Sequence, residues 1–200
     1  MYLFLDSSLF IQVGILDESL KWVHHEIVNN KKGSQVLHSI IYSCLEDQNI
    51  KVADLKGLFL ANGPGSYTGI RVAEGIGQIL ELDNLPVFSF YHFEVPSFCD
   101  IEDYSFFAEA FKGEIFHFTY KQGKEDFKLI KEKDFNLLDL SNDHQFHLEG
   151  EVLGRELDRL YDLFPAHSQK IFTKVLERGK HLPPYYFRPE DKEFNLPKSR

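Results

Sequence analysis

Cysteine is scarce in this 200-residue chain, which contains only Cys44 and Cys99. No CxxC pair and no cysteine–histidine spacing typical of a zinc site is present. The scarcity excludes a disulfide-rich scaffold and predicts two reduced thiols. We therefore expect no metal site.

The opening residues are also not expected to act as a secretory signal or a membrane span. The opening residues, MYLFLDSSLFIQVGIL, contain no basic stretch and carry Asp6, Ser7, Ser8 and Gln12 among the apolar ones. A secretory signal needs a positively charged start, and a transmembrane helix needs a longer apolar run. The sequence predicts a cytoplasmic protein that does not contact a membrane.

Positive charge is in short supply. Lysine and arginine number 22 against 31 aspartates and glutamates, which gives a formal net charge of −9. Unaided binding to nucleic acid needs clustered cations to meet the phosphates, so the composition argues against it. The hydrophobic fraction, 43%, is that of an ordinary globular protein, and the length fits one α/β domain or two small lobes.

The first half alternates strand-like and helix-like segments. Apolar runs at 2–6 and 9–16, followed by KWVHHEIV at 21–28, predict a three-stranded antiparallel meander. In the last run we place Trp22, His24, Glu26 and Val28 on one face of the strand. Helix, strand, helix and strand are then expected in turn, at 34–48, 57–62, 69–82 and 86–90. This order predicts an α/β sheet of mixed strand direction.

The second half is less regular. Two apolar runs, 104–111 and 114–122, flank Lys112-Gly113 and predict a hairpin. We place a lobe boundary near 95–103, which gives lobes of 1–100 and 101–200, the second smaller and followed by an extended tail.

Two helices are expected near the end of the chain. EVLGRELDRLYDLF at 151–164 has apolar residues at helical spacing, and Pro165 is expected to end that helix. SQKIFTKVLERG at 168–179 predicts a second helix that stops at Gly179.

The stretch NGPGSYTGIRVA, at 62–73, is the most distinctive in the sequence. A P-loop or a dinucleotide loop would need a glycine where Thr68 or Ile70 stands, and no lysine occurs from 57 to 111. Both motifs therefore fail. Two alternatives stay open, a tight strand-to-helix turn and a generic anion site at the helix start. The candidate residues for such an anion or cofactor site are Asp6, Gly63, Gly65, Ser66 and Thr68. We expect no bound cofactor.

The helix after this loop has an apolar arc wider than one sheet requires. Small residues recur every four positions, at Gly69, Ala73 and Gly77, and would let another backbone approach. The neighbour is either the helix at 34–48 or a partner chain. The expected partner interface is Gly69, Ile70, Ala73, Ile76, Gly77 and Leu80 with Leu37 and Ile41 of the earlier helix.

No catalytic residue is predicted. Asp6 alone lacks the second carboxylate, basic clamp and phosphate loop that phosphoryl transfer requires, and it can instead fix the Ser7-Ser8 turn. A peptidase would need a metal pair or a catalytic dyad. His24 and His25 are adjacent on a strand, so they point to opposite faces and cannot share one metal.

Three segments together resemble one known family. GPGSYTGIRVA at 63–73 resembles the TsaB (YeaZ) signature loop, LFLDSS at 3–8 resembles that family's opening strand and turn, and LPPYYFRPE at 182–190 resembles its C-terminal segment. The loop match is specific, and the other two extend the resemblance over most of the chain. The matching loop residues are Gly63, Pro64, Gly65, Ser66, Tyr67, Thr68, Gly69 and Arg71.

The resemblance implies a two-lobed actin/Hsp70/sugar-kinase-like fold of the ribonuclease H type, with the second lobe reduced. It also implies a non-catalytic subunit in the synthesis of N6-threonylcarbamoyladenosine at tRNA position 37. Such a subunit binds a catalytic paralogue, TsaD, through its first-lobe helices, an ATPase, TsaE, joins that pair, and tRNA is met only through the complex.

One departure from the family bears on nucleotide binding. The family's second-lobe hairpin carries two arginines where this chain has Phe111 and Lys112, which removes anion-binding groups. A rival hypothesis is a small nucleotide-hydrolysing or kinase-like enzyme that uses Asp6 and the 63–69 loop. A homodimer through the same helix surface is also expected when the protein is alone.

Overall fold

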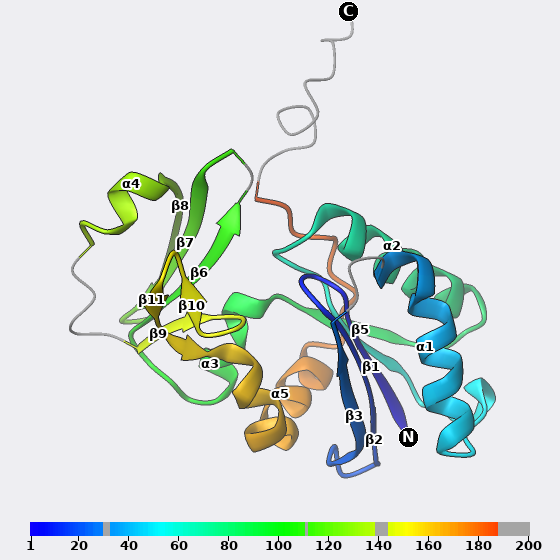
Figure 1. Cartoon of the computed structure of the whole chain (residues 1–200). Coiled ribbons are helices and arrows are strands. Elements are labelled where there is room, and N and C mark those ends of the chain that lie inside the picture. Colours follow the sequence, from blue (N-terminus) through cyan, green and yellow to red (C-terminus); the bar gives the residue numbers. More distant parts are fainter. Residues whose placement is uncertain (30–32, 111, 139–143, 188–200) are drawn as a thin grey trace, which may run out of the picture.

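The computed structural model describes residues 1–29, 33–110, 112–138 and 144–187, and the side chains of 33–35 are not described. Figure 1 shows two lobes, each built on its own sheet, with β1–β5 in one and β6–β12 in the other. Among the residues called above, Phe111 and the end of the C-terminal segment, 188–190, lie outside the described residues.

The first lobe contains a five-stranded sheet in the order β3-β2-β1-β4-β5. β2 pairs antiparallel with both β1 and β3, whereas β4 and β5 run parallel to β1. The predicted β-β-β-α-β-α-β order is therefore confirmed. The strands are β1 (Tyr2–Asp6), β2 (Ile11–Leu16), β3 (Trp22–Val28), β4 (Leu58–Ala61) and β5 (Val87–Phe90).

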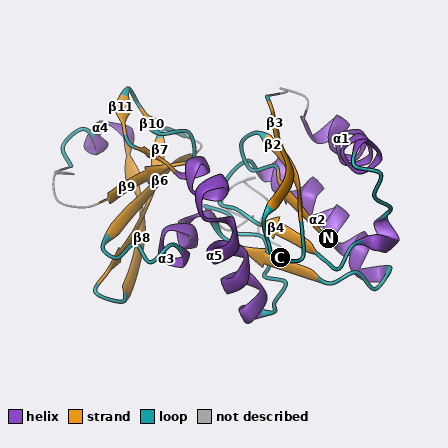
Figure 2. Cartoon of the chain, turned by 90° about the horizontal axis from the view of Figure 1, so that it is seen from below, coloured by secondary structure: helices purple, strands orange, loops and turns teal. Residues whose placement is uncertain are grey.

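Alternation along these strands separates two cores. Leu58 and Leu60 of β4 face α1 (Gly33–Asp47) and α2 (Tyr67–Leu82), whereas Phe59 faces the opposite side. That opposite side packs against α5 (Leu163–Arg178), where Phe172 lies 4.6 Å from Phe59 between ring centroids. Figure 2 shows α5 between the two lobes, on the far side of the sheet from α1 and α2.

The second lobe repeats this topology. Its sheet has the order β12-β9-β6-β7-β8, with β6, β7 and β8 antiparallel and β9 and β12 parallel to β6. The predicted hairpin at Lys112-Gly113 is confirmed, and both residues have φ of 69°. The strands are β6 (Tyr104–Ala110), β7 (Glu114–Lys121), β8 (Lys124–Lys131), β9 (His144–His147) and β12 (Asp158–Arg159), with a separate hairpin of β10 (Glu151–Val152) and β11 (Arg155–Glu156).

Short helical segments complete the described chain. They lie before β4, between the lobes, after β8 and before α5, and they are η1 (Val52–Asp54), η2 (His92–Glu94), α3 (Val95–Phe98), α4 (Glu132–Phe135) and η3 (Leu160–Asp162).

The helix predicted at 151–164 is wrong. Leu153 and Gly154 have φ of 49° and 79°, which makes them the tight turn of the β10–β11 hairpin and excludes a helix. The apolar residues at helical spacing lie instead in the β10–β11 hairpin, next to the short strand β12, and in the helical turns of η3 and the start of α5. Pro165 lies in the first turn of α5, where its missing N–H costs nothing, so it does not end a helix. Gly179 follows α5 with φ of 61°, which confirms the predicted stop.

Strand β3 also departs from simple alternation. The pairing of β2 with β3 shifts between Ile15 and Leu16, which is a bulge. As a result Trp22 lies on the face of His25, with their rings stacked at 4.5 Å, and not on the face of Val28 as predicted. His24 and His25 do point to opposite faces, as predicted.

The chain returns to the first lobe after α5. The backbone N–H of Ser89 donates to Lys180, and the N–H of Tyr185 donates to Asn62. The residues up to Phe187 thus lie along the ends of β4 and β5, and Tyr185 contacts the aromatic core between the lobes. The C-terminal segment is part of the packing that holds the lobes together.

Candidate functional site

The signature loop packs directly on the Ser7-Ser8 turn. The N–H of Ser66 donates to the Ser8 carbonyl at 2.6 Å, and the Ser7 hydroxyl donates to the Gly69 carbonyl at 2.7 Å. Ser66 caps α2 by accepting a hydrogen bond from the N–H of Gly69 at 3.4 Å. These two N–H groups are already bonded within the chain, so they do not form a phosphate cradle.

The glycines of the loop allow this close approach. A Cβ placed on Gly69 would lie 1.9 Å from the Ser7 carbonyl oxygen, and one on Gly65 would lie 2.6 Å from the Ser8 carbonyl oxygen. Gly63 has φ of 104°, which strains any other residue. Of the two alternatives left by the sequence, the geometry favours the tight turn over the anion site. Thr68 is exposed and takes no part in this contact.

Asp6 is wholly buried beneath the loop. One carboxylate oxygen accepts the N–H of Ser8 at 2.8 Å, as the predicted turn requires. The other is 2.8 Å from Nε2 of His92, whose side chain is equally buried. Both oxygens of Asp6 thus have partners within the chain, and the carboxylate is not exposed to a ligand at the surface.

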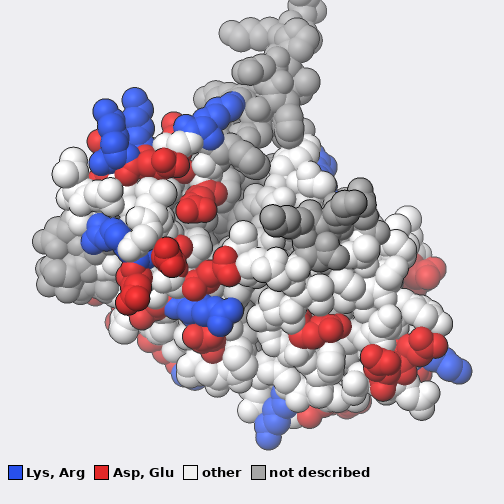
Figure 3. Space-filling model, in the orientation of Figure 1, with Lys and Arg blue, Asp and Glu red and all other residues white. Residues whose placement is uncertain are grey.

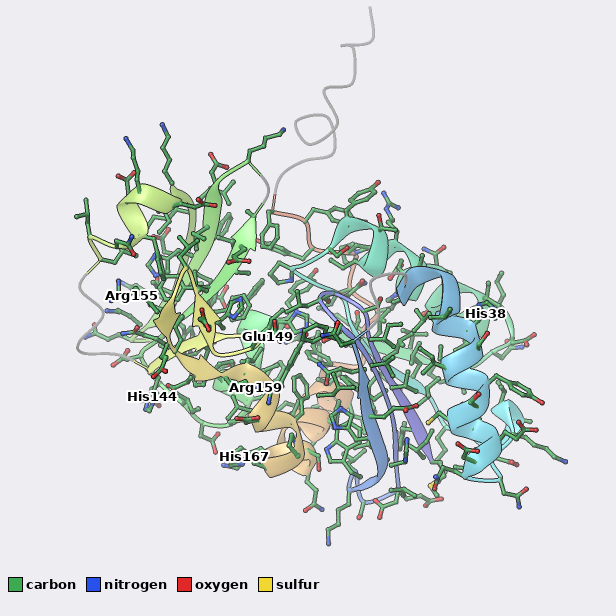
Figure 4. The ribbon with its side chains drawn as sticks, viewed as in Figure 1. His38, His144, Glu149, Arg155, Arg159 and His167 are labelled. Atoms are coloured by element: carbon green, nitrogen blue, oxygen red, sulfur yellow. The ribbon has the colours of Figure 1, made fainter. Side chains whose placement is uncertain are left out.

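A cleft of about 220 Å³ opens above this loop, between the lobes. Two carboxylates, Glu109 and Glu149, are among its described lining residues, and none of those residues is a lysine or an arginine. Burial lowers the pKa of His147, which also lines it, to about 4, so that imidazole is neutral at pH 7. Figure 4 shows Glu149 between the lobes. Such a lining repels a polyphosphate.

Asp6 and His92 also do not form a hydrolytic site with the neighbouring Ser8. Nδ1 of His92 and Oγ of Ser8 are both buried and have no hydrogen-bond partner, so no hydrogen bond joins this imidazole nitrogen to the hydroxyl. A catalytic base must lie within hydrogen-bond reach of its nucleophile and of a substrate, and His92 is 0% exposed. The arrangement is a packed, hydrogen-bonded pair of side chains at the ends of parallel strands.

The face of α2 that was expected to contact a partner is buried inside the chain. Gly69, Ile70, Ala73 and Gly77 are buried within the chain, with Gly69 against the backbone of Ser7 and Gly77 against β4 and β5, and Leu37 of α1 is likewise buried. These residues cannot contact a partner, because the chain's own core already covers them. Ile41, Ile76 and Leu80 are half-buried, at the margin of the same core.

The outer faces of both helices carry exposed apolar side chains. Tyr42 of α1 is 65% exposed, and Ile79 and Leu82 of α2 are 64% and 84% exposed. A Cβ added to Gly75 would meet nothing within 4 Å, so the outward side of α2 is open there. We call Tyr42, Gly75, Ile79 and Leu82 the outer strip. On the face that Figure 3 shows, charged side chains are sparser over this lobe than over the other one.

Arg71 of the signature loop faces the C-terminal segment. Its guanidinium lies 5.4 Å from the ring centroids of both Tyr67 and Tyr186, a cation–π arrangement. The two tyrosine rings are themselves 4.9 Å apart. The conspicuous arginine of the motif thus connects the start of α2 to the returning chain.

A second contact fastens the same segment. Nε2 of His181 lies 3.0 Å from Glu74, and Nδ1 lies 2.9 Å from Glu81, both on α2. The hydrogen bond to Glu74 raises the pKa of His181 to about 9, against the effect of burial and with help from Glu81. Burial would raise the pKa of Glu74, but bonds from His181, Gln78 and Asn62 outweigh it and lower that pKa.

The stabilisation from His181 should depend on pH. The pKa of about 9 lies above the unfolded value of 6.5, so the contribution is complete below about pH 6.5 and is lost as pH rises through about 9. We expect His181→Ala to cost about 1–2 kcal/mol of unfolding free energy at pH 6.5 and little at pH 10, after allowance for partial exposure. Urea unfolding of both proteins across this range checks it. An equal cost at both ends would show that the histidine acts by packing alone.

Comparisons with known proteins identify the fold. No protein-family model and no curated protein sequence matches the chain. A solved structure of YeaZ from Pseudomonas aeruginosa matches with a TM-score of 0.64 and 19% identity, over 93% of this chain and 99% of that one. A Pseudomonas aeruginosa protein described as uncharacterized, with similarity to peptidase YEAZ, matches with the same score and identity over 94% of this chain.

The predicted fold class is confirmed by these similarities. Both lobes have the mixed sheet of the actin-like, ribonuclease H-like fold, and nearly the whole chain takes part. None of the described helices is long and apolar enough to cross a bilayer.

Proposed function

We propose that this chain is a TsaB-type, non-catalytic subunit in the synthesis of tRNA threonylcarbamoyladenosine. It binds a TsaD-like catalytic paralogue in the cytoplasm, is joined there by a TsaE-like ATPase, and meets tRNA only through that complex. The fold shared with YeaZ and the signature loop support the proposal. So does the carboxylate of Asp6, which contacts His92 within the chain and is not free to hold a metal ion.

The outer strip carries the proposal. Large apolar side chains that are more than half exposed on two helices of one lobe are typical of a protein–protein contact. Both helices already bury their inner faces in the chain's own core, so the strip is surplus to folding. A surface of the same kind supports self-association when the paralogue is absent.

Substitutions in the outer strip test the proposal without unfolding the chain. Gly75→Arg and Ile79→Glu add charge where there is open space, and we expect either to weaken complex formation at least tenfold, the loss of about 1.4 kcal/mol. The measurement is co-elution and calorimetry with a TsaD-type paralogue, together with threonylcarbamoyladenosine formed on tRNA. Ala73→Arg and Gly77→Arg are unsuitable, because both positions are buried.

Two matched variants serve as controls. Gly75→Ala changes the same position without charge, and Phe127→Glu adds charge at a side chain 63% exposed on the other lobe. Neither should affect the complex. If Gly75→Arg and Ile79→Glu bind and support modification as the unmodified protein does, the outer strip is not the interface. If no paralogue binds the unmodified chain at all, the proposed function fails.

A further inference from the structure

Three side chains that can ligate metal gather between β3 and α1. They are His24 and Glu26 of the strand and Cys44 of the helix, and their ligand atoms all lie within 4.8 Å of one another. Nε2 of His24 is 3.9 Å from the nearer carboxylate oxygen of Glu26. Neither residue has a role in the joint between the signature loop and the Ser7-Ser8 turn.

The bulge in β3 removes the Trp22 ring from the face on which this group lies. It moves Trp22 to the interlobe side beside His25, whereas His24 and Glu26 keep the side that is covered by α1. There Cys44, itself 2% exposed, points from the helix into the same space. The side chains of His24 and Glu26 are 32% and 37% exposed, so the group is open to solvent on one side.

We propose that His24, Glu26 and Cys44 bind one divalent cation of the zinc class. Imidazole, thiolate and carboxylate are all ordinary zinc ligands, and three protein ligands plus one water complete a tetrahedral site. The thiol loses its proton to solvent as the sulfur–metal bond forms. The thiolate and carboxylate then balance the charge of the ion, which suits a half-buried place. Mg²⁺ and Ca²⁺ prefer all-oxygen sites and are not expected here.

The thiol differs from an ordinary surface cysteine in its environment. Burial, with the charges of Glu26 and Asp47, raises the pKa of Cys44 to about 11. Without a cation it therefore stays a protonated, apolar member of the core beside Leu45. A bound cation would join β3 to the last turns of α1, in addition to the apolar packing between them.

Cobalt and zinc titrations of the purified, reduced chain test the site. Co²⁺ bound to a thiolate gives a charge-transfer absorption band in the near ultraviolet, and we expect that band to saturate at one equivalent and to vanish when Zn²⁺ is added. Zn²⁺ should also raise the thermal midpoint in a concentration-dependent manner, whereas Mg²⁺ should not. Cys44→Ser should abolish the band. His24→Ala should weaken binding at least tenfold. Even residues that only hydrogen-bond to a metal ligand typically cost 10- to 100-fold in metal affinity when they are mutated.

Two variants that leave the group intact provide controls. Cys99→Ser removes the other buried thiol, and His38→Ala removes an exposed histidine of α1, and both should keep the band and the affinity. Because His24 is partly exposed, His24→Ala should fold even if Cys44→Ser does not. No band, or a band unchanged by His24→Ala and Cys44→Ser, would overturn the proposal. Failure of the titration would leave the outer strip and its partner unaffected.

Discussion

Gly69→Ala should cost about 3 kcal/mol of unfolding free energy, a large fraction of the stability of a typical domain. The added Cβ would lie 1.9 Å from the carbonyl oxygen of Ser7, a backbone atom that cannot rotate away. To make room, α2 would have to withdraw from β1 and lose the hydrogen bond from the Ser7 hydroxyl. Urea unfolding followed by circular dichroism measures the loss.

The same substitution in the same helix should have the opposite sign six residues later. Gly75→Ala meets nothing within 4 Å, so alanine's better helix propensity should add about 0.5–1 kcal/mol. A general intolerance of α2 to alanine would destabilise both variants equally. If Gly69→Ala is as stable as the unmodified chain, the loop does not approach the turn as closely as described.

The two glycines show where the sequence misleads. A four-residue recurrence of small residues is a sign of close packing, but it does not say which neighbour approaches. Here the neighbour of Gly69 is the backbone at Ser7, brought near by a strand 62 residues earlier, and that of Gly77 is the sheet itself. Chain-distant contacts of this kind cannot be read from periodicity, so the sequence assigned to a partner a face of α2 that the chain's own core covers.

Local signals were sufficient for the first lobe. Its strands and helices were predicted in the right order because each has a clean period and a clear boundary. The region around 151–164 failed because a hairpin with a Leu153-Gly154 turn can imitate helical spacing over so short a stretch. The bulge that moved Trp22 has no signature in the sequence of β3 alone.

Part of the candidate site could have been found by a general rule. The carboxyl ends of neighbouring parallel strands meet at one edge of a sheet, so residues after β1, β4 and β5 should lie together. Asp6, Asn62 and His92 stand at these ends, and the structure brings Asp6 and His92 into contact. His181 could not have been found this way, because it comes from a segment with no regular structure.

Asp6→Ala should cost about 3–5 kcal/mol, since it leaves His92 buried without its partner and the N–H of Ser8 without its acceptor. His92→Ala should cost a similar amount. The double variant should be more stable than the sum of the two losses implies, by a coupling energy of about 1–3 kcal/mol. Denaturant unfolding of the four proteins gives that energy. Asp17→Ala is the matched control, because Asp17 fixes an exposed turn without a histidine, and its loss should cost far less than the loss of Asp6.

This cycle also separates the proposed subunit from the rival enzyme. A carboxylate kept to hold metal and phosphate is commonly retained at the expense of stability, so its removal should leave the fold as stable or more so and abolish the heat of Mg-ATP binding. A structural Asp6–His92 contact predicts the reverse: Asp6→Ala should lose much stability, and the unmodified protein should give no heat of Mg-ATP binding. A stable Asp6→Ala protein that had lost tight Mg-ATP binding would therefore establish the nucleotide enzyme. A large loss of stability without any Mg-ATP binding would mean that the carboxylate holds the end of β1 to the segment after β5.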